Sequence, residues 1–329
     1  MRYIAEITEQ FRWITTLAGA GPARLPRSGQ GHEWFSNLPA NLESAEGFWI
    51  ISGVYLALLL AGLAIDLVMG VRLLVARNVP LTPPTDWTRG VEHLKGRPWT
   101  WREAGLILSI LLVAQLAFNG IHWFFVERQA TAMDVDMLAV LCQGVGFHLI
   151  GLAALAWVIH CRRGSWADAF GMRRQEMLRR VGQGMLWYLG ILPVVLVTSL
   201  AYQMILFRFG YPFSVQNVVL FFIEPQSLGV QIFLLVLAIG IAPLTEEALF
   251  RGLALPLLAR TVGVLPAVML TAAGFALIHF HVPSFAPLFV LAMGFALAYI
   301  VTRSLWVPVV MHALFNGMNI GLLLLATAG

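Results

Sequence analysis

Residues 234–258 read LLVLAIGIAPLTEEALFRGLALPLL, an apolar stretch that is interrupted by Glu246, Glu247 and Arg251. As a helix rising 1.5 Å per residue, such a stretch crosses a hydrocarbon core of about 30 Å. A charged residue at the centre of a membrane helix costs about 2.5–3.5 kcal/mol, so these side chains need partners or water. Glu247 and Arg251 are four positions apart, acid first, which predicts an ion pair on one face of the helix. Glu246 lies about 100° round the helix and is left outside that pair.

The rest of the chain has the same apolar character. It has 329 residues, of which 59% are hydrophobic and 12% charged, and its mean hydropathy is +0.79. Soluble domains carry roughly a quarter charged residues, so water is not the main solvent of this chain. We expect an all-α integral membrane protein, a bundle of about eight transmembrane helices, because open sheet edges would leave backbone groups unpaired in lipid. The predicted spans are about 48–76, 104–126, 137–160, 184–206, 228–258, 262–280, 284–302 and 305–327.

Charge and composition divide the chain into three segments. Residues 1–47 form an extramembrane N-terminal segment, residues 48–183 hold the N-terminal transmembrane helices and basic loops, and residues 184–329 form a C-terminal membrane domain. Most basic residues lie in the loops 77–103 and 161–183, which the positive-inside rule places in the cytoplasm with both termini outside. Membrane topology therefore accounts for the net charge of +4, and we expect no nucleic-acid binding.

Two further polar pairs lie in the predicted spans that follow the glutamates. Phe275 and His279 are four residues apart, and so are His312 and Asn316, which places each pair on one helix face. An imidazole and an amide N–H can together stabilise a developing oxyanion. Taken alone, His279 would favour hydrogen bonding between membrane helices, and His312 with Asn316 would suit that role as well as a catalytic one.

Taken together, the polar residues of three neighbouring spans predict a water-holding chamber suited to hydrolysis. Glu246 would take a proton from water, and His279 would orient that water or share its proton. His312 and Asn316 would stabilise the tetrahedral oxyanion of a peptide carbonyl. Polar residues of the first three spans are interpreted as hydrogen-bonding groups between helices, with a place along a substrate path as the alternative. They are Asp66, Gln115, Asn119, His122, Gln143 and His148.

The three polar clusters resemble the motifs of the CAAX protease and bacteriocin-processing family, the type II CAAX prenyl endopeptidases. The motifs are intact and in order, with E-E-x-x-x-R at Glu246, Glu247 and Arg251, F-x-x-x-H at Phe275 and His279, and H-x-x-x-N at His312 and Asn316. Each motif alone is weakly specific, but their joint occurrence in correctly spaced predicted spans is specific. The resemblance covers about residues 185–329.

This resemblance implies an intramembrane endopeptidase with residues 184–329 as its catalytic membrane domain. Glu246 and His279 would activate water, and His312 and Asn316 would form the oxyanion hole. The supporting residues would be Glu247, Arg251 and Phe275. The implied substrate is a peptide or protein with a membrane-associated segment, lipidated or not. The implied location is a cell membrane, with a prokaryotic inner membrane expected, where the chain is multi-pass and contacts lipid.

The resemblance leaves the cofactor and two other functions open. Members have been read either as glutamate-type enzymes that need no cofactor or as metalloproteases, in which case Glu246, His279 and His312 would hold zinc. The chain has no H-E-x-x-H motif. One alternative function is a non-catalytic, immunity-type member that binds a membrane partner in the same chamber. The other is a transporter that uses the buried acids.

Overall fold

The chain folds into helices, and the described residues contain no β-strand. The computed structural model describes residues 45–75, 85–127, 132–211, 222 and 228–327. The expected N-terminal segment 1–47 lies outside the described residues apart from the first turn of the first helix. Residues 1–56 and 322–329 form one unit, and residues 57–321 form a second, larger one. Every contact described below lies within the larger unit.

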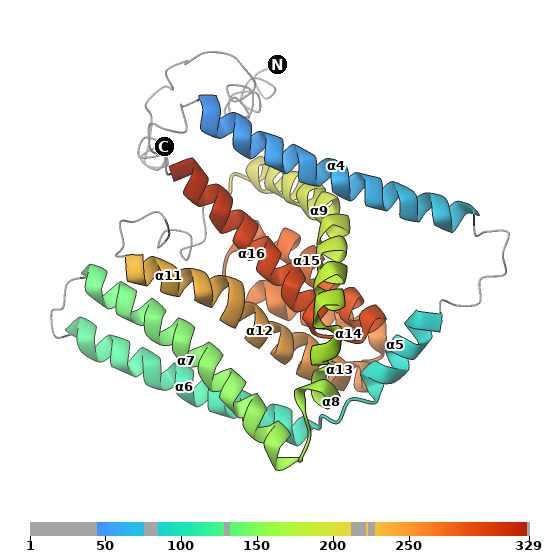
Figure 1. The fold of residues 1–329 in the computed structure, drawn as a ribbon. Helices are drawn as coiled ribbons and strands as arrows, with labels where there is room; N and C mark the ends of the chain where they lie inside the picture. The colour runs from blue at the N-terminus through green and yellow to red at the C-terminus, as the bar shows by residue number, and fades with distance from the viewer. Residues whose placement is uncertain (1–44, 76–84, 128–131, 212–221, 223–227, 328–329) are drawn as a thin grey trace. The chain divides into compact units, whose positions relative to one another are not determined.

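The N-terminal half of the described chain is a series of helices joined by short connections (Figure 1). Helices α6 and α7 lie side by side as an antiparallel hairpin, and α7 also packs against α12. The helices are α4 (Ala45–Val75), α5 (Thr85–Lys95), α6 (Trp101–Glu127), α7 (Ala132–Cys161), α8 (Trp166–Phe170), the 3₁₀ turn η3 (Arg174–Glu176) and α9 (Met177–Arg208).

The C-terminal half begins with a long helix that contains two π-helical turns. Each π turn ends directly before an Ala-Pro or Leu-Pro pair, at Pro243 and Pro256. Proline lacks an N–H and crowds the preceding turn, and a π turn accommodates this without ending the helix. The elements are α11 (Leu228–Val236), η4 (Leu237–Ile241), α12 (Ala242–Glu247), η5 (Ala248–Ala254), α13 (Leu255–Val262), α14 (Val264–Leu277), η6 (Val282–Ser284), α15 (Phe285–Thr302) and α16 (Trp306–Thr327).

Each predicted span coincides with a helix or with an uninterrupted run of helices. Among the described residues, four helices are long and apolar enough to cross a membrane, so an all-helical integral membrane protein is confirmed, whereas the count of about eight spans stays a prediction. Helix α14, for example, has 14 residues and rises only about 21 Å. The four are Trp101–Ile121, Arg174–Arg208, Leu228–Val262 and Val282–Thr302.

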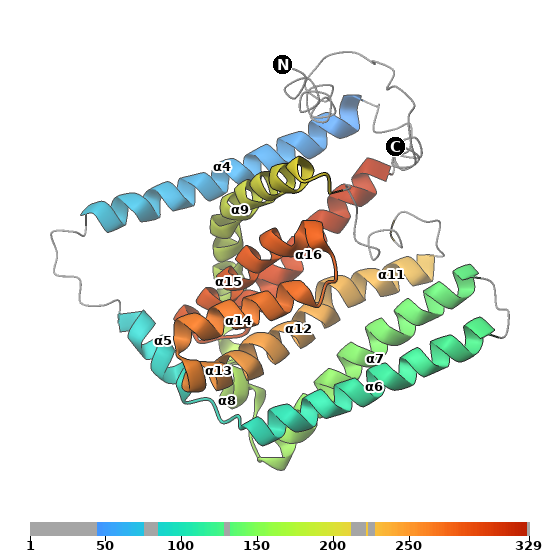
Figure 2. The same ribbon diagram turned by 180° about the vertical axis from the view of Figure 1, so that it is seen from behind.

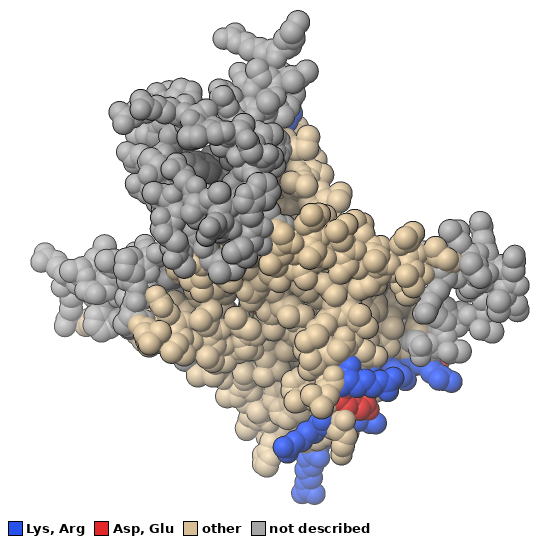
Figure 3. All heavy atoms as spheres, turned by 45° about the horizontal axis from the view of Figure 1, so that its top comes forward, with Lys and Arg blue, Asp and Glu red and all other residues tan. Residues whose placement is uncertain are grey.

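The surface of the described residues also fits a membrane environment. On the face drawn in Figure 3, most of the visible Lys and Arg side chains gather at one edge together with the visible acidic atoms, and nearly all of the remaining described surface on this face is uncharged. Many large apolar side chains are exposed, among them Leu108, Val113 and Leu116 on α6. Exposed apolar side chains on this scale are expected where a helix faces lipid.

Helix α15 lies at the centre of the larger unit. It packs against α5, α9 and α14 (Figure 2). Its residues belong to two apolar cores, since Ala296 and Ile300 pack with α5 to α8, whereas Ala292 and Phe295 pack with α9, α14 and α16. Small residues at helix contacts allow membrane helices to approach closely. The glutamate motif and the H-x-x-x-N motif both lie next to α15. Packing against this buried helix therefore sets the distance between the two motifs.

One arginine joins several turns at one end of the helices. Arg97, which is 3% exposed, donates from Nη1 to Asp168 O at 2.8 Å and from Nη2 to Arg303 O at 3.1 Å. Arg260 in turn donates to Arg97 O at 3.2 Å and to Trp99 O. These residues come from the turns after the first, third, fifth and seventh predicted spans. Alternating crossings require those four turns to lie on one side of a membrane, and their contacts support that topology.

Gly90 provides a test of how closely α5 approaches α15. A Cβ built on Gly90 would lie 2.1 Å from the Ile300 carbonyl oxygen. This clash is with backbone, so no side-chain rotation on α15 can relieve it. We expect Gly90→Ala to destabilise the protein by about 1–3 kcal/mol, measured as a lower thermal unfolding midpoint in detergent. Gly105→Ala on α6 is the control, because a Cβ there meets no atom within 4 Å. Equal midpoints for the two variants would contradict this packing.

Candidate active site

The three motifs place their side chains around the middle of the long helix. The ion pair expected between Glu247 and Arg251 is present, with Arg251 Nη1 2.9 Å from Glu247 Oε1 and both side chains 0% exposed. Arg251 Nη2 donates to Ala292 O on α15 at 2.9 Å. The guanidinium also lies 4.7 Å from the ring centre of Phe275, within range of a cation–π contact. Arg251 therefore neutralises Glu247 and ties the glutamate motif to α14 and α15.

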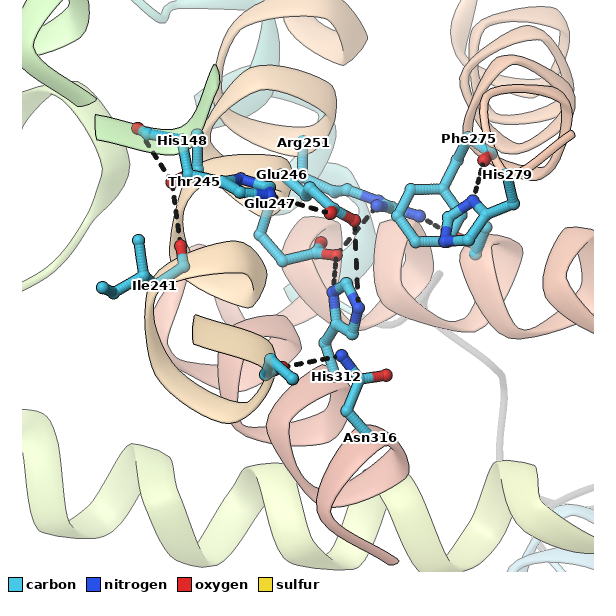
Figure 4. Close-up of polar contacts among 12 residues, drawn as sticks. His148, Ile241, Thr245, Glu246, Glu247, Arg251, Phe275, His279, His312 and Asn316 are labelled. Carbon is cyan, nitrogen blue, oxygen red and sulfur yellow. Dashed lines mark hydrogen bonds and ion pairs between the residues drawn. The ribbon is translucent and has the colours of Figure 1, made fainter. Parts of the chain in front are cut away.

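His312 lies between the two glutamates. Its Nδ1 is 3.0 Å from Glu247 Oε1, and its Nε2 is 3.9 Å from Glu246 Oε2 (Figure 4). The ring stacks on Phe295, with centres 5.3 Å apart, and meets Phe275 edge-on at 5.5 Å. Two aromatic rings and one buried carboxylate thus fix the orientation of the imidazole. An ionised carboxylate only accepts hydrogen bonds, so Nδ1 carries the proton in this contact.

Glu246 stays outside the buried ion pair, as its position on the helix predicted. Its Oε2 is buried and has no hydrogen-bond partner within the described part of the chain, and 14% of the side chain is exposed. The carboxylate faces two imidazoles, with Oε1 4.0 Å from His148 Nε2 and Oε2 3.9 Å from His312 Nε2 (Figure 4). Both distances are too long for direct hydrogen bonds. Glu246 therefore retains the capacity to accept a proton or a water molecule.

His279 and Asn316 lie at the edge of this cluster. The Nδ1 atom of His279 is 2.8 Å from Phe275 O, so that nitrogen is the donor and Nε2 is left as an acceptor in the neutral ring. The ion-pair contacts of Glu246 and Glu247 run to other residues and do not include His279. Asn316 Nδ2 donates to Ala238 O in the π turn η4 at 2.8 Å. The structure thus joins Glu247, Arg251, Phe275 and His312 by direct contacts and places Glu246 3.9 Å from His312. It connects His279 through Phe275 and Asn316 through η4.

His148 is a neighbour of the site, although the sequence pattern favoured a role in contacts between helices. It comes from α7, and the Thr245 hydroxyl donates to its backbone oxygen at 3.4 Å. No spacing within α7 indicates this contact, because it depends on how α7 packs against α12. Of the other polar residues expected in the first spans, Gln115 donates to Asn119 on its own helix at 2.9 Å. The side chains of His122 and Gln143 lie outside the described residues.

The hypothetical zinc ligands do not converge on one point. Glu246 and His312 approach each other to 3.9 Å, whereas none of the ion-pair contacts of Glu246 and Glu247 includes His279. Among the described residues, no group of three or more His, Cys, Asp or Glu side chains has the arrangement of a metal site. Zinc requires three or four protein ligands at about 2.0–2.3 Å. In this conformation, Glu246, His279 and His312 do not form such a set of ligands.

A basic groove of about 440 Å³ lies elsewhere, at the end joined by Arg97. Burial, with Arg97 and Arg303 nearby, lowers the pKa of His93 to about 4. Hydrogen bonds from the Ser165 hydroxyl and backbone hold the pKa of Asp168 below its usual value. No residue of the three motifs lines the groove, so we assign it no role in the reaction. Its lining is Arg89, Glu92, His93, Gly96, Arg97, Asp168 and Arg303.

Comparison with known proteins agrees with the motifs. A family model described as type II CAAX prenyl endopeptidase Rce1-like matches residues 228–318. That segment runs from the start of α11 into α16 and contains all seven motif residues, but it excludes α7 and His148. No curated protein and no solved structure matches the chain significantly. Residues 228–318 therefore match an Rce1-like domain, and this match supports the resemblance to the CAAX protease family.

Proposed function

We propose that this protein is an intramembrane endopeptidase that hydrolyses a peptide bond in a protein substrate with a membrane-associated segment. The observation that carries the proposal is the state of Glu246, a partly exposed carboxylate between two imidazoles and beside a neutralised Glu247–Arg251 pair. Its place in a domain of a peptidase family supports the same function. The family description adds a substrate class, a C-terminal segment that follows a prenylated cysteine.

Glu246 acts as the general base in this proposal. Its Oε2 accepts a proton from a water molecule as that water attacks the peptide carbonyl. Neither of its oxygens is used by Arg251, which donates to Glu247 instead. His279 presents Nε2 as an acceptor that can orient the same water, because Nδ1 is held by Phe275 O. The fixed pair Glu247–Arg251 keeps the charges beside Glu246 constant during the reaction.

The role of His312 depends on whether its ring is neutral or protonated. With Nδ1–H donating to Glu247, the neutral ring offers only a lone pair at Nε2. Glu246 and Glu247 carry two negative charges against one positive charge on Arg251, so a second proton on His312 makes the cluster neutral. The protonated ring then donates from Nε2 to the oxyanion, where buried donors stabilise the transition state most. Asn316 uses one amide N–H for Ala238 O and has the other for the same oxyanion.

Cleavage of two matched peptides by the purified full chain tests the proposal. One peptide carries a prenylated cysteine near its C-terminus and the other carries the unmodified cysteine, and products are identified by mass spectrometry. We expect release of a short C-terminal peptide from the prenylated substrate, at a rate that depends on Glu246. Cleavage at the same rate by Glu246→Gln would refute the peptidase mechanism. A non-catalytic member would instead bind the peptide equally with and without Glu246, and a transporter would move a solute across proteoliposomes.

Asn316→Ala is expected to lower kcat by about 10²–10³-fold with little change in KM, because it removes one oxyanion donor. Steady-state kinetics with the cleaved peptide measure this effect. Asn319→Ala is the matched control, since Asn319 lies on the same helix, is exposed and donates to Phe315 O of its own helix. We expect wild-type kinetics for the control. A loss confined to KM, or an equal loss in both variants, would remove Asn316 from the oxyanion hole.

A further inference from the structure

His148 brings a third imidazole to the site from outside the matched family segment. Its Nε2 lies 4.0 Å from Glu246 Oε1, and 13% of its side chain is exposed. Its Nδ1 is buried and has no hydrogen-bond partner among the residues that the structure describes. The polar contact of the His148 ring is therefore with an oxygen of Glu246, the proposed general base.

The backbone of α7 holds His148 in this position. The hydroxyl of Thr245, the residue before Glu246, donates to His148 O at 3.4 Å and to Ile241 O at 2.8 Å. Gly151, about one turn further along α7, faces the same threonine, since a Cβ built there would lie 3.1 Å from Thr245 Cγ2. Close contact at Thr245 places the His148 ring beside the next residue of α12. Phe147 meets the ring edge-on at 5.3 Å and limits its rotation.

A purely structural role does not explain the imidazole. Histidine in membrane helices commonly bridges neighbouring helices by a hydrogen bond from its ring. Here the bridge between α7 and α12 uses the backbone oxygen of His148, which any residue would supply. The ring takes no part in that hydrogen bond, and among the described residues its Nε2 has an ion-pair contact with Glu246. A buried polar ring without a structural partner is expected to serve the site it faces.

We propose that His148 is a positioning residue for Glu246. A separation of 4.0 Å exceeds a hydrogen bond but fits one bridging water, which would accept from or donate to Nε2 and donate to Oε1. Because this bridging water holds Oε1 of Glu246, Oε2 of the same carboxylate is directed toward His312 and the water that attacks the substrate. The inference rests on the proposed function and extends it, because α7 then completes a site that residues 228–318 do not complete alone.

Four variants of the full chain test this role. His148→Phe keeps the ring's bulk without its nitrogens, His148→Ala removes the ring, and His148→Gln restores a polar atom at the reach of Nε2. His160→Ala is the control, because His160 is exposed near the end of the same helix. We expect His148→Phe and His148→Ala to lower kcat about 10–100-fold with KM unchanged, as misplacement of a catalytic group does. His148→Gln should recover most of that loss, and the control should match the wild type.

A second measurement keeps this inference separate from the peptidase proposal. The infrared carboxylate band of Glu246, identified by its absence in Glu246→Gln, should shift in His148→Phe and stay unchanged in His160→Ala. An unshifted band, or wild-type kcat in His148→Phe, overturns the positioning role, as does failure of glutamine to restore kcat. If the wild type cleaves no peptide while the band shifts, the proposed function fails and the contact between His148 and Glu246 remains.

Discussion

Replacing Glu246 with glutamine is expected to lower the cleavage rate by about 10²–10⁴-fold, the usual contribution of a general base. The amide has the shape of the carboxylate but cannot take a proton from water. Folding should persist, because Glu246 lies outside the Glu247–Arg251 pair and its contacts to His148 and His312 exceed 3.5 Å. The measurement is cleavage of the prenylated peptide by purified protein, together with the thermal unfolding midpoint.

Glu92→Gln supplies the control for this change. Glu92 is an exposed acid on α5 that lines the basic groove and contacts no motif residue. The same chemical substitution there should leave cleavage at the wild-type rate. Full activity in Glu246→Gln would mean that another group activates the water. Equal losses in Glu246→Gln and Glu92→Gln would point to a general effect of lost charge.

Arg251→Met is expected to destabilise the protein by about 3–5 kcal/mol, the cost of leaving a buried charge without its partner. Glu247 would keep its negative charge at 0% exposure with only His312 nearby, and the bond to Ala292 O would be lost. Unfolding of the detergent-solubilised protein, followed by denaturant or heat, measures the change. The double variant Arg251→Met with Glu247→Gln should regain some of the stability, since it removes the stranded charge.

An exposed ion pair provides the comparison for this experiment. Arg173 and Glu176 approach to 3.8 Å, but the arginine side chain is 68% exposed. Pairs of this kind contribute about 0–1 kcal/mol, so Arg173→Met should change stability little. If Arg251→Met costs no more than Arg173→Met, the buried pair does not hold the glutamate motif to α14 and α15.

The sequence predicted the helices well because the membrane restricts the choices. In lipid, an apolar run of sufficient length must form a helix so that its backbone N–H and C=O groups are hydrogen-bonded. Each predicted span therefore coincides with helical residues in the structure. The pair Glu247–Arg251 was equally predictable, because its partners are one helical turn apart on one helix. The two π turns before Pro243 and Pro256 were not, since proline indicates a disturbance without specifying its form.

The neighbours of Glu246 were harder to predict because they depend on packing between helices. Thr245 and His148 O are 97 positions apart, and their contact depends on where α7 meets α12. Sequence spacing correctly put His279 and Phe275 on one face, but it could not say which way that face turns relative to Glu246. His312 reached both glutamates because α16 and α12 flank the same central helix.

The contacts of Arg97 have a consequence for how a substrate reaches Glu246. The buried guanidinium of Arg97 binds the turns that contain Asp168 and Arg303, and Arg260 binds the backbone of Arg97 itself. The helix ends there therefore cannot move away from each other independently. Separating them would leave several carbonyls unpaired together with a charge, at a cost of about 1–3 kcal/mol for each group. If the proposed peptidase function holds, we therefore expect a polypeptide substrate to enter away from these joined helix ends.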